Sequence, residues 1–504
     1  MSSPSTGSVW AATAKLPSYS PLTTDATADV CVIGAGISGL TTAYLLTQVG
    51  KTVVVLDDGA IGSGMTGMTT AHLVNALDDR FMDLERLHGE RGSRLAAESH
   101  TAAIDHVESI VARERIACDF TRLDGYLICG PEEDEAYLDR ELEAAHRAGL
   151  HNVLKVGRAL ITYDTGPCLR FPNQAQFHPL KYLAGLAEAI ERGGGRIFTG
   201  THATKVDGGK HASVSTRSGT VSAGAIVVAT NTPVNDLVVV HTKQAPYMTY
   251  VIGALVPHNS IPLMLLWDTS DPYHYVRLQP GVDADHDLLI VGGEDHKTGQ
   301  ADDIEERHGR IEQWSRARFP SMREVTYRWA GQVMEPVDSL AFIGHNPLDN
   351  ENVYTVTGDS GNGMTHGTIA GILITDLILG RHNPWQSLYD PGRVTLRATK
   401  EFAKEAANMA AQYADWVTGG DVSSPDEIEK DSGAVVRRGA LKLAVYRDAT
   451  GALHERSAVC THLGCIVQWN PVEKTWDCPC HGSRFDKFGD VINGPANVGL
   501  PRVT

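Results

Sequence analysis

The run Gly34-Ala-Gly-Ile-Ser-Gly39 constrains this chain more than any other feature, because it joins a fully apolar stretch to one with helical spacing. The surrounding text, ADVCVIGAGISGLTTAYLLTQVG, predicts a buried strand, a glycine turn and a helix that ends near Gly50. The β-branched run KTVVVL follows, and such runs are typical of strands buried in a parallel sheet. The chain therefore opens with a β-α-β unit of an α/β fold.

The spacing within this turn predicts a dinucleotide site. Gly34 permits the tight turn, Gly36 lets the backbone approach a pyrophosphate, and Gly39 lets the helix pack on the strand. Asp57 ends the second strand, where an acid is expected to hold ribose hydroxyls, and we prefer it to Asp58. A glycine turn without a ligand is the structural alternative. The motif alone does not separate NAD from FAD.

Composition excludes several classes of protein. With 504 residues, 42% of them hydrophobic and 21% charged, the chain suits roughly two to four domains and is neither disordered nor fibrous. Its 44 basic and 61 acidic residues give a net charge of −17, which argues against a nucleic-acid or anionic-membrane partner. Neither a long apolar run nor a secretory signal is found, so we expect a cytoplasmic protein without a membrane span.

The elements indicate four segments. Residues 1–28 read as an N-terminal arm, and 29–393 as one large domain with helical stretches at about 80–149, where the acidic run 132–135 marks a solvated helix start. The runs AIVVAT, DLLIVGG and LAFIG predict a second, mixed or antiparallel sheet that could carry a substrate. Another strand, turn and helix follow at 352–380. Residues 394–432 read as a helix and a linker, and 433–504 as a small all-β module.

The last segment holds a cluster of cysteine and histidine. Its two motifs, CTHLGC at 460–465 and CPCHGS at 478–483, offer six soft or borderline ligands in two loops. A tetrahedral zinc ribbon and a Rieske [2Fe-2S] centre could both use two cysteines and two histidines. Zinc ribbons usually show C-x-x-C in each loop, whereas C-x-H paired with C-x-x-H is the Rieske arrangement. Both motifs resemble the Rieske proteins of cytochrome bc and b6f complexes, with Gly494-Pro495-Ala496 at the family's proline loop.

This resemblance implies a role for each residue of the cluster. The implied pairs are Cys460 with Cys478 on one iron, His462 with His481 on the other, and Cys465 with Cys480 in a disulfide that braces the loops. Two hydroxyl donors also tune such clusters in that family. Ser483 matches the first, whereas Phe485 replaces the tyrosine expected as the second. We expect a reduction potential below that of respiratory Rieske proteins, within about −150 to +300 mV.

A second resemblance covers residues 29–393. The glycine turn, GSGMTGMTTAH (62–72), FHPLKYLAGLA (177–187), VVATN (227–231), YRWAGQVMEPVDSLAFIG (327–344) and TGDSGNGMTHG (357–367) resemble the D-amino-acid oxidase-like family of FAD-dependent amine and amino-acid oxidoreductases. There, FAD lies extended across a Rossmann-like domain and a substrate sheet covers the isoalloxazine. The implied FAD-binding segments are about 29–80, 170–235 and 336–393, with the substrate sheet mainly at 240–335.

The family pattern implies a set of cofactor residues: Gly34, Gly36 and Gly39 at the pyrophosphate, Asp57 at the ribose, Ser63, Gly64 and Thr66 along the phosphates and ring, and Gly361, Gly363 and Met364 at the pyrimidine end. An ordinary glycine turn is the alternative for the last group. His72 lies in the region of covalent flavin attachment, without matching its position. Gln332 stands where many amino-acid oxidases carry arginine, which weakens the case for a simple amino acid as substrate.

A carboxylate-bearing substrate would need a bidentate arginine, and Arg277 is the candidate, with Tyr275 and His274 beside it. Strand alternation places Tyr275 and Arg277 on one face and His274 on the other, so at most one set points at the flavin. The structural alternative is a solvated arginine and two packing rings.

Together the two halves predict an enzyme in which the flavin accepts two electrons and the cluster passes them on one at a time. An amine or amino-acid-like small molecule would give hydride to FAD, and the cluster would relay single electrons to an external acceptor or donor protein. A Rieske oxygenase would need Asp/Glu-x-x-His-x₄-His, and none of the three candidate pairs, at 85/88, 271/274 and 305/308, has the second histidine. A non-catalytic electron-transfer protein serving a partner enzyme is the alternative.

Overall fold

The first large sheet of the computed structural model, which describes residues 7–159, 161–235, 240–347 and 350–503, has a parallel centre. Its strand order is β16-β17-β10-β1-β2-β7, and β8 and β9 extend it from β10. The bounds are β1 Ala26–Ile33, β2 Val53–Leu56, β7 Arg196–Phe198, β8 Ala203–Asp207, β9 Ala212–Thr216, β10 Thr220–Val228, β16 Phe342–His345 and β17 Val353–Thr357. Strand β1 pairs in parallel with both β2 and β10, which confirms the β-α-β unit.

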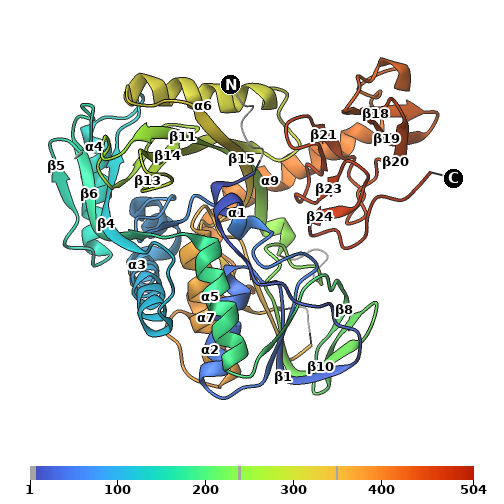
Figure 1. Ribbon diagram of the computed structural model, residues 1–504, viewed down its shortest axis with the longest axis horizontal. Helices are drawn as coiled ribbons and strands as arrows, with labels where there is room; N and C mark the ends of the chain where they lie inside the picture. The colour runs from blue at the N-terminus through green and yellow to red at the C-terminus, as the bar shows by residue number, and fades with distance from the viewer. Residues whose placement is uncertain (1–6, 160, 236–239, 348–349, 504) are drawn as a thin grey trace.

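Three helices pack together beside this sheet (Figure 1). They are α2 Ile37–Gln48, α5 Pro179–Arg192 and α7 Gly363–Ile378. Glycines of α7 allow the close approach to α2, since a Cβ on Gly371 would lie 2.6 Å from Cγ2 of Thr41. The glycine turn before α2 and the turn before α7 therefore open at the same edge of the sheet, where parallel α/β sheets bind ligands.

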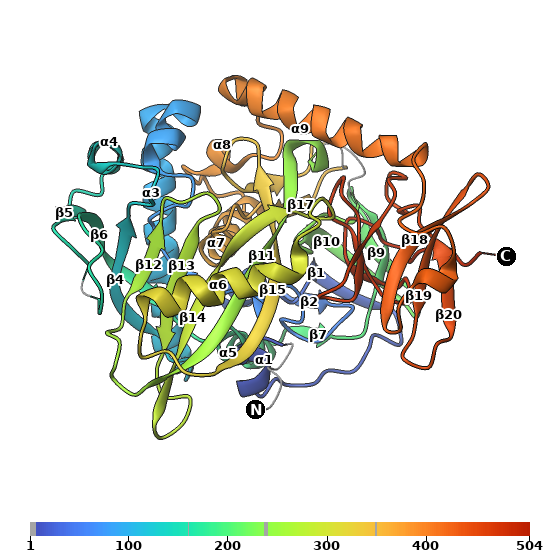
Figure 2. The ribbon, with the colours of Figure 1, turned by 90° about the horizontal axis from the view of Figure 1, so that it is seen from above.

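The second large sheet is mixed. Its order is β15-β11-β14-β13-β12-β4-β6-β3, with β5 paired to β6, and only β12 and β4 run parallel. The bounds are β3 His72–Leu73, β4 Thr121–Ile128, β5 Leu154–Val156, β6 Cys168–Gln176, β11 Gln244–Pro257, β12 Leu265–Asp268, β13 His274–Gln279, β14 His286–Lys297 and β15 Val325–Pro336. Helix α6, Ile304–Arg318, crosses one face of this sheet (Figure 2).

The membership of the two sheets differs from the sequence prediction. The runs AIVVAT and LAFIG lie in β10 and β16 of the first sheet, whereas four strands from residues 72–176 join the second. These strands stand among helices: α3 Phe81–Glu114 precedes β4 and α4 Glu135–Arg147 follows it. The acidic run 132–135 does start a helix, because Asp134 caps α4 by accepting the amides of Ala136 and Tyr137.

The N-terminal arm is anchored at both ends of its described part. Residues 1–6 of the expected arm lie outside the described residues. Helix α1, Val9–Thr13, buries Trp10, whose indole N–H donates to the carbonyl of Thr69 at 2.6 Å. Strand β1 already begins at Ala26, so the end of the arm belongs to the first sheet.

The C-terminal module is all-β, as predicted. A three-stranded sheet joins β18 Ser432–Arg438, β19 Leu441–Arg447 and β20 Leu453–Ser457, and a four-stranded sheet joins β21 Gln468–Asn470, β22 Thr475–Asp477, β23 Arg484–Asp486 and β24 Val491–Asn493. The expected linker packs against this module, because the amide of Asp421 donates to Val435 and Val422 bridges to Val436.

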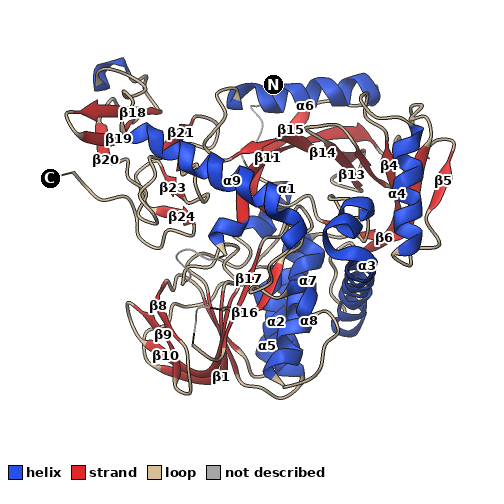
Figure 3. Cartoon of the chain, turned by 180° about the vertical axis from the view of Figure 1, so that it is seen from behind, coloured by secondary structure: helices blue, strands red, loops and turns tan. Residues whose placement is uncertain are grey.

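Helix α9, Thr399–Gln412, runs from the large domain to this module (Figure 3). Its Glu405 pairs with Lys297 of β14, and after its end Trp416 donates its indole N–H to Gly464 at 2.9 Å. The remaining short helices are η1 Met65–Gly67, η2 His241–Lys243, α8 Gln386–Tyr389, η3 Leu396–Ala398, η4 Tyr413–Trp416 and η5 Pro425–Glu427. Within the described ranges, every helix is too short or too polar to cross a membrane.

Candidate functional site

A cavity of about 290 Å³ is lined by residues from both large sheets and from the C-terminal module. One group of lining residues comes from the turns before α2 and α7. A second comes from β11, β12, β13 and β15, including Thr249, Trp267, Tyr275 and Gln332. A third comes from residues 491–494, 496 and 497. Three parts of the chain that lie far apart in sequence thus meet around one space.

The glycine turn forms a cradle that side chains would fill. Gly34 has a φ of +106°, and a Cβ there would lie 2.3 Å from the carbonyl oxygen of Ala229. A Cβ on Gly39 would lie 1.9 Å from the carbonyl oxygen of Gly34. Gly36 caps α2 without a side-chain hydrogen bond, so the helix N-terminus can face an anion. The turn fits the pyrophosphate of a dinucleotide.

Asp57 is held at this cradle by two backbone amides. Its carboxylate accepts from Ala35 at 2.6 Å and from Gly59 at 2.8 Å. Desolvation raises the pKa of Asp57 to about 6, although both amides lower it. The side chain of Asp58 is 63% exposed and pairs with His202 instead. This difference supports the preference for Asp57 as the ribose ligand.

The other predicted cofactor residues also surround the cavity. All of them except Gly39 are lining residues: Gly34, Gly36, Asp57, Ser63, Gly64, Thr66, Gly361, Gly363 and Met364. Gly361 has a φ of +68°, and Gly363 begins α7, so a helix N-terminus faces the cavity here as well. Backbone amides at a helix N-terminus can stabilise negative charge on a bound ring.

Of the three candidates on β13, only Tyr275 lines the cavity. Its hydroxyl lies 2.6 Å from that of Thr249. His274 instead stacks on Trp314 of α6, with ring centroids 4.3 Å apart, and bonds Asp268 at 3.0 Å. The expected alternation of faces therefore holds for Tyr275 and His274.

Arg277 does not reach the cavity, contrary to its expected role as a substrate clamp. It is 0% exposed, and Nη1 donates to three carbonyl oxygens, of Thr70, Ala71 and Phe177, at 3.0–3.1 Å. Two residues along a strand span about 6.6 Å, so Arg277 lies beyond Tyr275 and packs 5.1 Å from the ring of Trp10. Backbone carbonyls therefore engage Nη1, and Nη2 donates to Oε1 of Gln279 at 2.7 Å.

Several cavity residues were not singled out from the sequence. Asp78, Tyr273 and Asp359 line the cavity beside the second sheet. Tyr273 donates to Asp78 at 3.3 Å, and Asp359 accepts the amide of Met334 at 3.2 Å. In the sequence, only the repeated acids in ALDDRF and the acid in TGDSGNG could indicate that Asp78 and Asp359 belong to a site. Acids are common at turns, so this indication is weak. His72 also lines the cavity, and burial lowers its pKa to about 3, so the ring is neutral.

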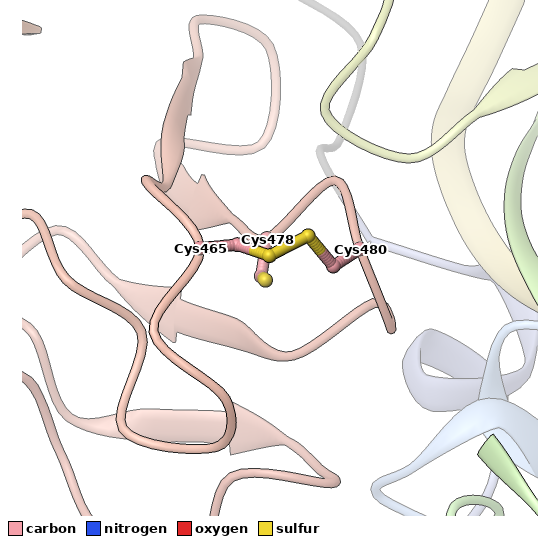
Figure 4. A group of neighbouring side chains, drawn as sticks. All are labelled: Cys465, Cys478 and Cys480. Carbon is pink, nitrogen blue, oxygen red and sulfur yellow. A yellow bond between two sulfur atoms is a disulfide. The ribbon is translucent and has the colours of Figure 1, made fainter. Parts of the chain in front are cut away.

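The two C-terminal loops bring their cysteines and histidines together. Cys465 and Cys480 form the predicted disulfide, and Cys478 lies beside it (Figure 4). Cys460 and Cys478 are buried free thiols. The rings of His462 and His481 lie 4.8 Å apart. His481 is 1% exposed, yet neither ring nitrogen has a hydrogen-bond partner in the described part of the chain. Buried thiols and an orphaned imidazole fit the ligand set of a [2Fe-2S] cluster.

These loops face the large domain. The ring of His241, from η2, lies 5.1 Å from that of His462 and 6.3 Å from that of His481. Gln332 of β15 donates to the carbonyl of Gly482 at 2.9 Å and accepts from Asn493. Gln332, which stands where the family pattern has arginine, therefore links the cluster loop to the cavity wall.

Comparison with known proteins identifies both parts of the chain. The model of the FAD dependent oxidoreductase family (DAO) matches residues 29–377, and that of the Rieske [2Fe-2S] domain matches residues 419–504. The chain belongs to the FAD dependent oxidoreductase (DAO) family. The Rieske match begins before the predicted boundary at 433 and includes the segment that packs along β18.

Relatives of this DAO-family protein share one or both domains. A Bacillus subtilis (strain 168) protein named for a Rieske 2Fe-2S iron-sulfur centre, YhfW, is 32% identical over 98% of this chain and 97% of its own length. Gamma-glutamylputrescine oxidoreductase of Escherichia coli (strain K12) is 28% identical over 74% of this chain and 89% of its length. The cytochrome b6-f complex iron-sulfur subunit 1 of the Cyanophora paradoxa cyanelle is 33% identical over 27% of this chain and 52% of its length.

Solved structures agree with the DAO fold. L-proline dehydrogenase from P. horikoshii superimposes with a TM-score of 0.59 and 18% identity, and covers 73% of this chain and 97% of its own. Glycine oxidase from Geobacillus kaustophilus gives a TM-score of 0.61 and 16% identity over 73% and 99%. At these identities the likeness concerns the fold alone. The family places FAD in the first domain and a [2Fe-2S] cluster in the second.

Proposed function

We propose that this protein oxidises an amine or amino-acid-like small molecule at FAD and passes the electrons singly through the Rieske cluster to an external acceptor. The observation that carries the proposal is the shared cavity, whose wall combines FAD-site residues such as Gly361 with Asn493 and Gly494 of the Rieske domain. Such proximity favours transfer between two cofactors within one chain. The relative named gamma-glutamylputrescine oxidoreductase supports an amine as the substrate class.

Each group of residues has a defined task in this proposal. Bound FAD supplies a two-electron acceptor for hydride from the carbon beside the substrate nitrogen, and a bound cluster supplies a one-electron outlet. The α2 N-terminus and Asp57 hold the dinucleotide, while the amides around Gly361 stabilise charge at the pyrimidine end. Tyr275 and Trp267 line the substrate end. The oxidised substrate is an imine, which water hydrolyses.

The cluster ligands in this proposal are the four predicted ones. Cys460 and Cys478 hold one iron, and His462 and His481 hold the other. Both histidine rings lie near His241 of the large domain, so a cluster held by His462 and His481 would have its histidine ligands beside the FAD domain. The external partner is a one-electron acceptor or donor protein, and the net charge of −17 favours a basic partner surface over nucleic acid. We place the reaction in the cytoplasm.

Anaerobic mixing tests the proposal. Purified, iron-loaded protein is mixed with a panel of amines, amino acids and hydroxy acids, while flavin bleaching is followed optically and the reduced cluster by EPR. Bleaching by one substrate class, followed by a Rieske EPR signal, is the expected result. If only a reduced carrier protein bleaches the flavin, the electron-transfer alternative replaces the enzyme.

A further inference from the structure

We propose that the substrate end of the cavity selects a cationic amine that carries no carboxylate group. This inference rests on the proposed function and names its substrate class. It comes from the charges and contacts of the cavity wall beside the second sheet.

The described lining residues of the cavity include no lysine and no arginine. Four carboxylates line it, namely Asp57, Asp58, Asp78 and Asp359. Asp57 and Asp58 belong to the dinucleotide end, whereas Asp78 accepts from Tyr273, just before β13, and Asp359 accepts from the amide of Met334 in β15. A substrate carboxylate placed beside the second sheet would therefore meet two acids and no lysine or arginine among the lining residues, which is a repulsive arrangement.

The immediate surroundings of Asp78 suit an ammonium group. Tyr273 donates its hydroxyl to Asp78, and its ring lies 5.5 Å from that of Tyr275. Trp267 also lines this end. A carboxylate flanked by aromatic faces is the usual environment for a buried organic cation, because the carboxylate accepts charged N–H groups while the rings attract the charge. Asp78 also packs on Gly361, since a Cβ there would lie 2.0 Å from its Oδ2.

A second layer of acids lies behind the cavity wall. The hydroxyl of Ser360 lies 2.6 Å from Oδ2 of Asp79 and 2.7 Å from Oε2 of Glu335. Because one hydroxyl carries one hydrogen, it satisfies only one of these oxygens, and the other contact needs a proton on a carboxyl group. Desolvation raises the pKa of both acids. A pair that holds one proton carries one negative charge instead of two, and burial favours that protonated form.

In the described part of the chain no arginine forms an ion pair with Asp78 or Asp359, although the charge of Arg80 lowers the pKa of Asp78 against a larger rise from desolvation. Arg80 donates to the carbonyl oxygens of Leu77 and Asp268, both at 3.1 Å. Arg277 is occupied by carbonyls of other segments. An incoming ammonium group could pair directly with these carboxylates, which gives the cavity a reason to prefer amines.

Matched pairs of compounds that differ by one carboxylate test this inference. The FAD-loaded, iron-loaded protein is mixed anaerobically with 1,4-diaminobutane or ornithine, and with benzylamine or phenylglycine. We expect the amine of a pair to reduce the flavin about tenfold or more faster at equal, subsaturating concentration, since a hydrogen bond to a charged group contributes about 1.5–3 kcal/mol. Perturbation of the flavin spectrum by each compound in the absence of turnover measures binding separately.

The outcomes separate this inference from the proposed function. Faster reduction by the amino acids would overturn the cationic selection and leave the proposed function standing. Binding of the amines without flavin reduction would support the selection and overturn the proposed function. If no member of either pair binds or reduces the flavin, both are overturned.

Variants provide a second test. Asp78→Asn and Asp359→Asn keep the shape of the wall and remove its charge, so each is expected to lower the amine to amino-acid ratio of kcat/KM by about tenfold. Damage to folding alone would lower both rates and leave this ratio unchanged. Asp105→Asn is the matched control, since that side chain is 63% exposed and pairs with Arg122 outside the cavity. An unaltered ratio in both cavity variants overturns the inference.

Discussion

The guanidinium of Arg277 joins backbone segments that are distant in the sequence. Thr70 and Ala71 follow the flavin-site turn, and Phe177 precedes α5, so one side chain holds two walls of the large domain together. Burial lowers the pKa of Arg277 to about 9, which leaves the group charged at neutral pH. Its contacts favour a structural role over substrate recognition.

We therefore expect Arg277→Met to destabilise the large domain by about 3 kcal/mol, because three carbonyl oxygens lose their donor. Thermal unfolding measures this loss, with Arg316→Met as the control, since Arg316 makes a largely exposed ion pair with Glu312. KM of the remaining active fraction is expected to stay unchanged. A raised KM with an unchanged melting temperature would instead support the predicted role of Arg277 in binding the substrate.

A second residue-scale prediction concerns the cluster potential. Phe485 is fully buried among the cysteines of the Rieske core, and the neighbouring Ser483 accepts the amide of Ala496 at 3.0 Å. Phe485→Tyr adds a hydroxyl donor that stabilises the reduced, more negative cluster. A gain of about 1 kcal/mol corresponds to a rise of roughly 40 mV for a one-electron couple.

Redox titration followed by EPR measures this rise, and Phe488→Tyr is the control because Phe488 lies outside that core at a partly exposed turn. An unchanged or lower potential in Phe485→Tyr would contradict the hydrogen-bond argument. The prediction concerns the cluster alone, so it is independent of the substrate.

At the residue scale, the sequence predicted best where chemistry depends on local spacing. The glycine turn and the Cys-x-His motifs carry their geometry in a few consecutive residues. Asp78 and Asp359 are 281 positions apart in numbering and meet only because the turn after β3 and the turn before α7 border one cavity. Gln332 was noticed as a departure from the family pattern, but its contact with Gly482 depends on domain docking.

At the element scale, α9 and its neighbours fasten the Rieske domain to the second sheet. Gln300 donates to Pro479, beside the cluster ligands, and also pairs with Asn408 of α9 in both directions. Beyond the helix, Tyr413 donates to Leu463 at 2.8 Å. Both cluster loops are thus held by side chains from outside their own domain.

Removing the Gln300 side chain is expected to loosen this docking by about 3 kcal/mol, since three hydrogen bonds of about 1 kcal/mol each are lost. For Gln300→Ala we expect normal flavin reduction, with slower appearance of the cluster EPR signal after mixing with substrate. Gln313→Ala on the exposed side of α6 is the matched control. Equal cluster reduction rates in both variants would show that the docking does not govern the relay.

The disulfide gives another prediction for these loops. It closes a separation of 15 residues between Cys465 and Cys480, and a loop of that size is worth about 3 kcal/mol in the chain-entropy treatment. The double variant Cys465→Ala/Cys480→Ala is expected to lose its cluster absorbance at lower temperature. Cys129→Ala, which removes a partly exposed free thiol, serves as control. Cluster loss at the same temperature in all three proteins would contradict a bracing role.

The sequence predicted the elements unevenly, for identifiable reasons. Strand β1 ends in the apolar run 30–33 and β17 precedes a glycine turn, so the sequence predicts both. Strand β4 begins with the polar run Thr-Arg-Leu-Asp and lies between two helices, and its partners come from distant segments. No local pattern shows that β4 continues the sheet built by β11–β15, because that pairing is tertiary.

At the scale of the whole molecule, acids outnumber basic residues, and four of the acids line the cavity where the domains meet. The chain carries a net charge of −17, and two partly buried acids, Asp78 and Asp359, line the substrate end of the cavity. Desolvation raises the pKa of Asp359 to about 6, opposed by the amide of Met334. Buried histidines titrate in the opposite sense, since desolvation lowers the pKa of His366 to about 4. The pH dependence of wild-type stability therefore has two opposing contributions: the buried acids lose stability as pH rises, and the buried histidines lose it as pH falls.

Comparison of Asp359→Asn with the wild type isolates the acid. The folded wild type holds the Asp359 proton up to about pH 6, whereas the unfolded chain releases it near pH 3.9. The wild type therefore loses stability as pH rises between these values, by about 3 kcal/mol for a shift of roughly two units. Asparagine cannot ionise and can still accept the amide of Met334. Melting temperatures measured at pH 4 and pH 8 should show a larger stability advantage, or a smaller deficit, for the variant at pH 8. An equal difference in melting temperature at both pH values would mean that folding does not raise the pKa of Asp359.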